Sequence, residues 1–457
     1  MLLRKVYISG TDPSSWLLID EIHKNTESRI KWSTEISEKF SVLQGVKQGG
    51  LLSADLYKVY IEDLLNTFEN TTSGCEIGET LINAVACADD VAIVSENPHE
   101  LQYLVNIAAQ YSEDHHYLLQ PQKSVVIQVQ PSNRKKSEDP VRIYINNNAM
   151  PISDKSPHLG ILRSTTSQKT QDATVEQNIT KSRRAAYSLM SAGMHGENGL
   201  DPSTAIQLFK TFVQPILTYG LEVILPTSKN LLKLETFQKK ILKQILSVPI
   251  SAPDPSVYIM SGILPIEAQI DQKSLNLFNN ICNQNEDHLE KKIARRQLIA
   301  KIKKFIAIKR VLFKYDLQSP IVLLNDPPTK YSWKKSVRLA IDQYWKNALI
   351  QKSCTYKSLK YLGTSNISPG KCHTLLSIGN TSDPTREAVR ISVKLKVITD
   401  TYILQSHRSR YNLNETPTCK LCDTDIEDRS HFCLHVKYSN ALEKDILTKS
   451  MKLSLIS

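Results

Sequence analysis

The sequence predicts an α+β fold in which an antiparallel sheet with helices is followed by a long, mostly helical region. Strand-like apolar runs and hairpin turns are confined to the first 165 residues, whereas helical periodicity dominates from about residue 170 onwards. The chain of 457 residues is long enough for two or three domains of roughly 100–200 residues each. We therefore expect domains at residues 1–165, 166–315 and 316–457.

Composition limits the class of protein. Hydrophobic residues make up 41% of the chain and charged residues 23%, which is ordinary for a folded protein. The formal net charge of +11 favours a polyanionic partner such as nucleic acid. Most of the eight cysteines show no pairing pattern, and the N-terminus becomes charged too early for a signal peptide. Residues 212–226, the longest apolar stretch, fall short of the roughly 20 apolar residues of a membrane span. We expect an intracellular protein, nuclear or cytoplasmic, that is not secreted and has no membrane partner.

The first 60 residues have the pattern of helical segments joined by loops, and a helix is expected from about Ser53. Residues 81–94 are apolar except for Asn83 and the pair Asp89 and Asp90. This run predicts a buried strand, a tight turn at the aspartate pair and a second strand.

A second helix is expected from Asn97, because the run Asn-Pro-His-Glu has the form of a capping box with proline at the first helical position. Residues 125–129 alternate as a strand does. The segments 141–145 and 150–152 flank a run of three asparagines, which predicts a hairpin turn.

The helical region contains two amphipathic patterns. A helix starting at Asp201-Pro202 is expected to place the following apolar residues on one face: Ile206, Phe209, Phe212 and Val213. A second helix has apolar residues at 231–245 and five lysines opposite: Lys229, Lys233, Lys239, Lys240 and Lys243. Residues 291–314 carry ten basic residues and no acidic one. Such a run is either a solvated helix face or a surface for nucleic acid. Residues 318–410 contain no motif that we can interpret.

The aspartate pair is the first candidate site. Taken alone, two aspartates at a strand turn are most often an ordinary hairpin turn. Clustered carboxylates can instead hold Mg²⁺ ions that activate a 3′-hydroxyl and stabilise leaving pyrophosphate. The motifs around the pair favour the second interpretation, because they follow one another in a recognisable order: Gly45-Val-Lys-Gln-Gly-Gly-Leu-Leu-Ser53, Cys87-Ala-Asp-Asp90, Gln122-Lys-Ser124 and His158-Leu-Gly-Ile161.

This order resembles the palm of the reverse transcriptases of non-LTR (LINE-like) retrotransposons. Segments 214–220 and 234–238 look like the helices after the palm in the same family. The resemblance is strongest over about residues 1–260 and implies a partial fingers and palm, a helical thumb and a mostly helical tail. It implies RNA-directed DNA synthesis with Mg²⁺, an RNA template, a DNA primer and dNTPs.

The resemblance also implies roles for individual residues. Asp89 and Asp90 correspond to metal ligands, and Lys123 to a residue that faces the triphosphate and protonates the leaving pyrophosphate. The alternative for Lys123 is a solvated lysine at a strand start. The remaining matched positions belong to a template and nucleotide loop and to a primer grip, respectively: Gln48 and Gly49, then Leu159 and Gly160.

Three departures from the family pattern stand out. Ala54 replaces a usual proline, and Cys87 replaces a usual Tyr or Phe. The family's first metal-binding Asp precedes the segment that matches residues 1–10, and Asp12 and Asp20 lie in the wrong context to replace it. We expect an N-terminally truncated fragment that is inactive by itself. The alternative is a non-catalytic, nucleic-acid-binding relic of the reading frame, and a strand carrying Asp upstream of Met1 would favour the enzyme.

The second candidate site lies in segment 419–435. Cys419, Cys422, His431 and His435 have the spacing Cys-x2-Cys-x8-His-x3-His, which suits tetrahedral Zn²⁺. The segment resembles the zinc knuckle in the tail of non-LTR reverse transcriptases, where the fourth ligand is usually Cys. Val436 stands at that position here, so His435 or Cys433 must substitute. The alternative is a degenerate knuckle without metal.

Overall fold

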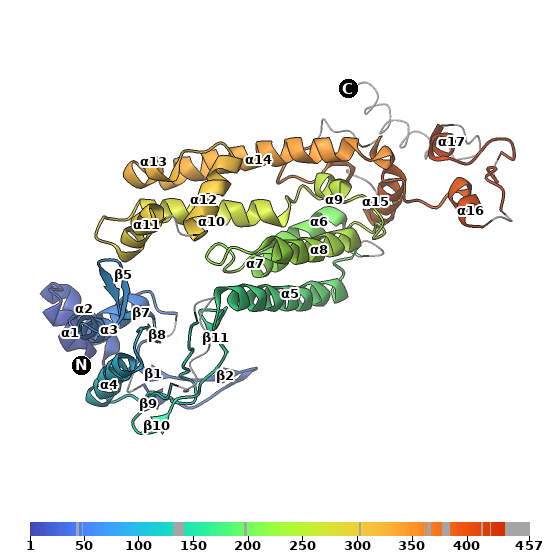
Figure 1. Cartoon of the computed structure of the whole chain (residues 1–457). Helices are drawn as coiled ribbons and strands as arrows, with labels where there is room; N and C mark the ends of the chain where they lie inside the picture. Colours follow the sequence, from blue (N-terminus) through green and yellow to red (C-terminus); the bar gives the residue numbers. More distant parts are fainter. Residues whose placement is uncertain are drawn as a thin grey trace. The chain divides into compact units, whose positions relative to one another are not determined.

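The chain folds into two compact units, residues 1–170 and residues 171–457, in the computed structural model (Figure 1). The described residues are 1–42, 45–47, 49–130, 141–195, 199–300, 303–360, 362, 367–376, 384–412, 415–420 and 422–434, with the backbone alone for 303–305, 384–388 and 433–434. The expected domain division at residues 165, 315 and 457 stays a prediction. One hydrophobic core contains residues from both sides of position 315, including Leu312 and Trp333.

Helices and short hairpins make up the first unit. Its helices are α1 (Leu2–Ile8), α2 (Pro13–His23), α3 (Ser53–Glu69) and α4 (Pro98–Asp114). Its strands form antiparallel pairs: β1 (Glu27–Ser28) with β4 (Phe40–Ser41), β2 (Lys31–Trp32) with β3 (Glu35–Ile36), β5 (Cys75–Ile77) with β6 (Thr80–Ile82), β7 (Ala84–Cys87) with β8 (Asp90–Ile93), β9 (Tyr144–Ile145) with β10 (Asn148–Ala149), and β11 (Lys155–His158) with β12 (Ile161–Ser164). The mixed helix and strand content is confirmed. Within the described ranges, however, no larger sheet joins these hairpins.

Local signals fix the two central helices of this unit. Helix α3 begins at Ser53, as predicted. Helix α4 begins at Pro98, and the Asn97 side chain accepts a hydrogen bond from the backbone N–H of His99. The predicted capping box is only half formed, because Glu100 accepts hydrogen bonds from Ser95 Oγ and the Gly74 N–H. Glu100 therefore ties the start of α4 to the β5–β6 hairpin.

The core of the first unit lies between α3 and α4. Its fully or nearly buried members are Ile61, Leu64, Phe68, Leu104, Ala108 and Tyr111. Three residues of the β7–β8 hairpin pack against this cluster: Ala84, Val91 and Ile93. Burial of apolar area stabilises the pair of helices by roughly 25 cal/mol per Å² removed from water. The helix pair thus forms the support on which the aspartate hairpin rests.

Two predicted segments differ in the structure. The expectation of helices and loops throughout the first 60 residues is wrong for residues 27–41, which pair as β1–β4 and β2–β3. The strand predicted at 125–129 is also wrong, since Val126 makes only an isolated bridge to Ile152. Val126 is buried while Val129 is 73% exposed, so the apolar alternation does not mark the buried face. The predicted hairpin turn is confirmed, with Asn146 and Asn147 between β9 and β10.

Helices dominate the second unit, as expected. They are α5 (Ser167–Ser191, which begins just before the unit boundary), α6 (Pro202–Leu208), η1 (Phe209–Val213), α7 (Gln214–Leu217), α8 (Ser228–Ile245), α9 (Asp254–Ser261), α10 (Ile266–Cys282), α11 (Leu289–Ile299), α12 (Lys303–Lys314), α13 (Pro320–Asn325), α14 (Lys330–Cys354), η2 (Lys357–Leu359), η4 (Thr374–Leu376), α15 (Pro384–Ile398), α16 (Gln405–Tyr411) and α17 (Arg429–Leu434). None of the helices in the described segments is both long and apolar enough to cross a membrane.

Two hydrophobic cores hold this unit together. The larger one joins α5, α6, α8 and α9 to residues of α15 and of the segment after α14. The smaller one joins α10 to α12, α13 and α14, and α14 runs alongside α10 (Figure 1). Trp333 fixes this second packing, because its indole N–H donates to the Leu275 carbonyl at 3.0 Å. Both cores lie within the second unit, so this helical region has an interior of its own.

The helix after Asp201 shows how one proline changes a predicted face. Ile206, Phe209 and Val213 are fully buried, as predicted, but Phe212 is 52% exposed. Residues Phe209–Val213 form a π-helical turn, which only Gln214 separates from Pro215. Proline has no N–H to donate to the preceding turn, and a wider turn accommodates that loss. The extra residue rotates Phe212 out of the apolar face.

Gly262 joins two segments that lie far apart in the sequence. It follows α9 in a left-handed conformation with φ of +65°. Its carbonyl accepts from the Gly370 N–H at 2.8 Å, and the Met260 carbonyl accepts from the His373 N–H at 2.9 Å. A Cβ atom on Gly262 would collide with the backbone of Lys371. Residues 367–376 therefore lie as a strap against the end of α9.

Candidate active site and metal centre

The aspartate pair lies at the tip of the β7–β8 hairpin. Cys87 pairs with Asp90, so the two-residue turn consists of Ala88 and Asp89, and this part of the prediction is confirmed. Ala88 has φ of +52°, a left-handed conformation that L-residues seldom adopt. Such strain often accompanies functional turns. Both carboxylates are exposed, and the flanking strands are only partly buried, so the expectation of fully buried strands is wrong.

Tyr57 is a neighbour of this tip that the sequence did not identify. It lies on α3, one turn after Ser53, and packs against the core of the first unit. Burial raises the pKa of its hydroxyl, and the negative charge of Asp89 raises the pKa further. The phenol therefore stays protonated near the carboxylate. Tyrosine at a helical core position gives no sequence signal for this role.

A partly buried lysine of α1 contacts residues of both α3 and α4. Lys5 donates to the Tyr60 carbonyl and to the Tyr111 hydroxyl, each at 2.7 Å, and pairs with Asp63 at 2.8 Å. Its ammonium lies 5.0 Å from the ring centroids of Tyr60 and Tyr111. Lys5 therefore fixes the N-terminal helix against the helices that support the aspartate pair.

The predicted glycine loop leads directly into α3. Gly49 lies in a turn with φ of +79°, which suits glycine. The Gly50 N–H donates to the Lys47 carbonyl at 2.9 Å, and Ser53 Oγ donates to the same carbonyl at 2.6 Å. These bonds fold the loop onto the start of the helix. Gln48 lies outside the described residues.

Lys123 lies in a turn rather than at the start of a strand. The backbone N–H groups of Lys123 and Ser124 both donate to the Gln120 carbonyl at 3.0 Å. The Lys123 side chain is exposed. Its ammonium can therefore reach an anionic ligand, and its predicted role stays untested.

Leu159 and Gly160 form the tip of the β11–β12 hairpin, where His158 pairs with Ile161. Both have positive φ, +50° for Leu159 and +76° for Gly160. This combination matches the hairpin turns whose twist fits the flanking strands, although a leucine is unusual in it. The two residues predicted for the primer grip thus lie at a second strained hairpin tip.

The second candidate site brings three predicted ligands together. Cys419, Cys422 and His431 place one ligand atom each within 4.8 Å of one another. Residues 418–420 and 422–426 form a knuckle, in which the Cys419 N–H donates to the Asp425 carbonyl and the Asp423 N–H donates to the Cys419 carbonyl, each at 2.8 Å. His435 lies outside the described residues, and the side chain of Cys433 lies outside them too.

The electrostatics of this cluster favour metal binding. A hydrogen bond from Thr424 and backbone N–H groups lower the pKa of the Cys422 thiol to about 6, so the thiolate is available at neutral pH. His431 directs Nε2 towards Cys422 Sγ at 3.2 Å and Nδ1 towards the Asp425 carboxylate at 3.8 Å. A carboxylate behind the imidazole is the usual outer partner of a metal-binding histidine.

The knuckle is docked on the helical body of the second unit. Arg429 donates to the carbonyls of Ser358 at 2.8 Å and of Ile398 at 3.2 Å. Phe432 stacks on Tyr402, with ring centroids 5.8 Å apart. Arg429 and Phe432 belong to the same short helix as His431, so the orientation of one ligand depends on the body.

A protein-family comparison identifies the first unit. Residues 4–170 match the family described as "Reverse transcriptase (RNA-dependent DNA polymerase)". Residues 4–170 are a reverse transcriptase domain. Because this match covers the aspartate hairpin, the glycine loop and the Leu159-Gly160 turn, the resemblance stated from the motifs is confirmed.

The domain is related to those of R2 non-LTR retrotransposons. A retrovirus-related Pol polyprotein from the type-1 retrotransposable element R2 of Bradysia coprophila is 23% identical over 265 residues, covering 56% of this chain and 28% of that relative. The corresponding polyprotein of the element R2DM of Drosophila melanogaster is 30% identical over 135 residues, 28% of this chain and 12% of the relative. The one from Popillia japonica is 23% identical over 228 residues, 49% and 30%. The chain spans less than a third of the length of each.

Within the reverse transcriptase domain, the fold brings two of the predicted catalytic residues together. Asp89 and Asp90 share one hairpin tip. Proximity of Gly49, Lys123 and the Leu159-Gly160 turn to that tip stays a prediction. Among the described residues, the only trio of His, Cys, Asp or Glu gathered closely enough for a metal is the Cys419 cluster, so no third such ligand joins the aspartate pair there.

The predicted basic faces are partly neutralised. Lys239 and Lys243 both bind Asp254, at 2.6 and 2.9 Å, and Lys243 is buried. Burial raises the pKa of Asp254, but the hydrogen bonds from the two lysines outweigh it and hold that pKa below its usual value. Lys240 remains exposed. A lysine face read from helical periodicity is thus partly a set of internal ion pairs.

The basic run at 291–314 shows the same mixture. Arg295 and Lys291 bind Glu286, at 2.9 and 3.0 Å. Lys314 binds Glu267 and Asp271, at 2.7 and 2.9 Å, beneath three aromatic rings. Acidic residues outside the run supply these partners, which the local sequence pattern does not reveal. The exposed members of the run include Arg296, Lys309 and Arg310.

Proposed function

We propose that the chain carries the palm of an RNA-directed DNA polymerase of an R2-like non-LTR retrotransposon, with an RNA template, a DNA primer and dNTPs as partners. The exposed aspartate pair at a strained hairpin tip, within a reverse transcriptase domain, is the observation that carries the proposal. Asp89 and Asp90 hold Mg²⁺. Gln48 and Gly49 contact the template and nucleotide, and Leu159 and Gly160 support the primer.

The donor set at the hairpin fits Mg²⁺. Mg²⁺ prefers hard oxygen ligands, retains several waters and is usually held by one or two carboxylates together with substrate phosphates. Asp89 and Asp90 offer such oxygens on an exposed turn, where waters and a triphosphate have access. When bound, the ion supplies positive charge at the transferring phosphate. Lys123 donates a proton to the leaving pyrophosphate from its exposed ammonium.

We further propose that these 457 residues alone do not polymerise DNA. The proposal is supported by the absence of a third carboxylate beside Asp89 and Asp90 within the described segments. Metal positioning provides much of the rate enhancement in phosphoryl transfer, so an incomplete set leaves little activity.

Primer extension on an RNA template with Mg²⁺ or Mn²⁺ tests this. We expect no extension above that of Asp89→Ala. Robust templated extension that Asp89→Ala abolishes would contradict the inactivity and establish the polymerase. A reverse transcriptase of known activity, assayed on the same template and primer, is the positive control.

A non-catalytic role in nucleic-acid binding is the second candidate, supported by the exposed basic residues of the second unit. Lys229 and Lys240 lie exposed on α8, and Lys309 and Arg310 on α12. We expect weak binding without strong sequence preference that falls steeply with salt, because each neutralised phosphate releases a counterion. Lys240→Glu should weaken RNA binding, whereas Lys239→Glu is a poor probe, because Lys239 binds Asp254. Affinity unchanged between low and high salt would count against phosphate contacts.

We also propose that Cys419, Cys422 and His431 hold one Zn²⁺ and that His435 completes the set. Two thiolates and an imidazole are ligands that Zn²⁺ favours. The proposal is supported by the convergence of the three ligand atoms and by the low pKa of Cys422. Metal content by native mass spectrometry tests it. If His435→Ala retains zinc as tightly as the wild-type chain does, Cys433 is the better fourth ligand.

The remaining assignments are proposals of the same kind. Residues 1–165 act as partial fingers and palm, residues 166–315 as a thumb-like region, and residues 316–457 as a tail with the zinc module. We propose an intracellular location, in nucleus or cytoplasm, which the similarity to retrotransposon polyproteins supports. Fractionation of cells that express the tagged chain checks the location.

A further inference from the structure

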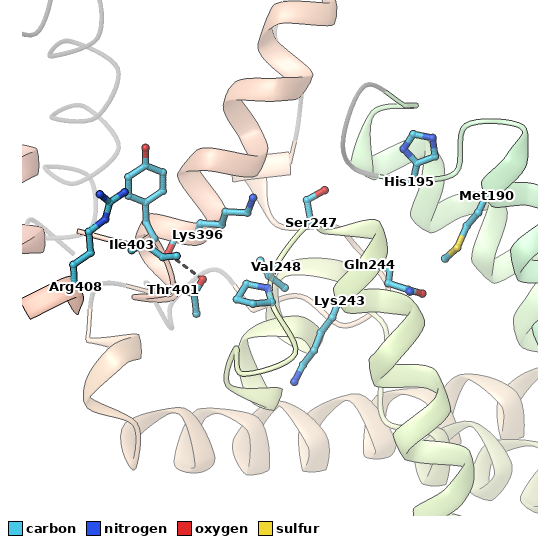
Figure 2. A pocket seen from close by; sticks show the side chains of 12 residues that line it. Met190, His195, Lys243, Gln244, Ser247, Val248, Lys396, Thr401, Ile403 and Arg408 are labelled. Carbon is cyan, nitrogen blue, oxygen red and sulfur yellow. Dashed lines mark hydrogen bonds between the residues drawn. The ribbon is translucent and has the colours of Figure 1, made fainter. Parts of the chain in front are cut away.

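A basic pocket in the second unit belongs to none of the sites described above. It encloses about 780 Å³ and lies where three helices end: α5, α8 and α15 (Figure 2). His195, Lys243, Lys396 and Arg408 line it together with hydroxyl and amide side chains, and Ser247 and Lys396 lie near its centre in Figure 2. A volume in this range accommodates a ligand larger than a single ion.

The charge of the lining has one sign. Four of the described lining residues are basic or can become so, and none is acidic. The nearby acids are already engaged: Asp254 binds both Lys239 and Lys243, and Asp400 lies 3.8 Å from the Arg429 guanidinium. Lys243 is buried, and its ammonium donates to Asp254 and to the Ile250 carbonyl, so Lys396 and Arg408 supply the positive charge of the lining. The pocket therefore attracts an anion.

Basic residues at helix C-termini often serve only to balance unpaired carbonyl groups. Here the protein itself supplies those partners. The Lys243 carbonyl accepts from the Val248 N–H at 3.0 Å, and the Lys396 carbonyl accepts from the N–H groups of Thr401 and Tyr402 at 2.8 and 3.0 Å. The Leu189 carbonyl at the end of α5 is satisfied in the same way. Capping therefore does not account for the basic lining.

Arg408 is the residue best placed to recognise a phosphate. Its side chain is exposed on α16 and has no hydrogen-bond or ion-pair partner within the described segments. A guanidinium offers a fork of N–H donors that matches two phosphate oxygens at once. Ser247 and Thr401 add hydroxyl groups to the same lining. The chemistry of the pocket is that of a phosphate ester site.

We propose that this pocket binds the phosphate backbone of a single nucleic-acid strand, with Arg408 and Lys396 as the main contacts. The inference rests on the proposed function, which makes nucleic acid the polyanion that the chain meets. The pocket is open to solvent, and its volume of about 780 Å³ is too small to take in a duplex, so the phosphates of one strand are the part of a nucleic acid that it accommodates. The pocket is distinct from the aspartate hairpin, since all of its lining residues belong to the second unit.

The test measures binding of a fluorescein-labelled single-stranded RNA by the full chain, using fluorescence anisotropy. Arg408→Ala and Lys396→Ala should each weaken binding by about three- to tenfold and lower the salt dependence by about one counterion. Arg410→Ala is the matched control, because it removes one exposed positive charge from the same helix but from outside the lining. It should change the affinity by less than about twofold. Arg408→Lys keeps the charge but loses the fork of donors, so its affinity should lie between those of the wild-type chain and Arg408→Ala. Thermal unfolding confirms that each variant folds.

Equal losses of RNA affinity in Arg408→Ala and Arg410→Ala would mean that net charge alone accounts for the effect, which would overturn the proposal that the pocket binds the strand. Displacement of the RNA by inorganic phosphate or a dNTP at equal phosphate concentration would assign the pocket to small phosphates instead. Equal sensitivity with a duplex probe would overturn the single-strand claim. Failure of the proposed function appears separately, as equal Mn²⁺ binding by Asp89→Asn and the wild-type chain, because Arg408 is not part of the aspartate hairpin.

Discussion

The aspartate hairpin and the Cys419 cluster differ in how far the fold prepares them for a metal. Asp89 and Asp90 are exposed at the end of a ribbon, whereas Cys419 and His431 are buried and already face Cys422. Mg²⁺ completes its shell with water and substrate, so an open turn suits it. Zn²⁺ in structural sites needs a closed shell of protein ligands. The burial of a ligand set thus indicates whether its metal serves the reaction or the fold.

The largest expected effect is loss of zinc from the buried set. Cys419→Ser should weaken zinc retention by at least about 100-fold, beyond the roughly 10–100-fold that a change in an outer partner costs. Native mass spectrometry of the full chain measures the bound metal. Cys354→Ser changes an exposed cysteine outside the cluster and is the control. Full zinc occupancy in Cys419→Ser would show that Cys419 is not a ligand, and the buried cluster would then not be a prepared zinc site.

The partly buried carboxylate of Glu235, on α8, gives a second test of what burial does to an acidic group. Burial raises the pKa of Glu235 to about 7, while its carboxylate accepts from the Ile266 N–H at 2.8 Å. The folded-state pKa lies above the unfolded value, so the folded chain binds more protons and its stability falls as pH rises from about 4.5 to 7. Glu235→Gln should be more stable than the wild-type chain at pH 8 by about 1–3 kcal/mol and similar to it at pH 4.

Urea unfolding across this pH range provides the measurement. Glu290→Gln, on an exposed residue of α11, should leave the pH dependence as it is in the wild-type chain. A parallel pH dependence in Glu235→Gln and the wild-type chain would mean that Glu235 does not govern this part of the stability.

Removing charge from the exposed hairpin should affect metal binding without affecting the fold. Asp89→Asn is expected to weaken Mn²⁺ binding by about tenfold, because one of two carboxylates is lost. Its free energy of unfolding should stay within about 0.5 kcal/mol of the wild-type value, as for other surface changes. Electron paramagnetic resonance of Mn²⁺ reports the binding. Glu79→Gln, at the tip of the β5–β6 hairpin, is the matched control. Equal Mn²⁺ affinity in Asp89→Asn and Glu79→Gln would show that the aspartate pair does not bind the ion.

The smallest effect concerns the strain at the aspartate turn. Gly78 and Ala88 occupy the same position in two-residue hairpin turns, with φ of +69° and +52°. Glycine adopts this conformation readily and alanine does not. Ala88→Gly should therefore stabilise the chain by up to about 1 kcal/mol, less the entropy that glycine adds to the unfolded state. Ala88→Val should destabilise it, and urea unfolding gives both values. A stabilising valine would contradict the left-handed turn.

The sequence predicted the elements whose signals are local. The Asn97 cap, the start of α3 at Ser53 and the turn at Asp89 depend on neighbouring residues and were correct. The family motifs also led to the right family. Spacing alone brought Cys419, Cys422 and His431 into one candidate set, and the structure gathers these three.

The failures depend on distant residues. Lys243 looked solvated because its partner, Asp254, lies on another helix. Phe212 left its predicted face because Pro215 forces a wider turn. Tyr57 carries no motif, and its relation to Asp89 exists only after α3 packs beneath the hairpin. Val126 is buried in a cluster with Val105, Ile143 and Ile145, which no alternation within residues 125–129 encodes.

Position 262 accepts no residue other than glycine. Its left-handed backbone disfavours nineteen of the twenty amino acids, and the Lys371 backbone occupies the space of any first side-chain atom. Residues 367–376 contain no recognisable motif. Their packing nevertheless restricts position 262, more than a hundred residues earlier, to glycine. A segment without a motif can therefore restrict the amino acid at a distant position. In mutational scanning, Gly262 should tolerate no replacement, whereas its neighbours Ser261 and Ile263 should accept small or apolar residues.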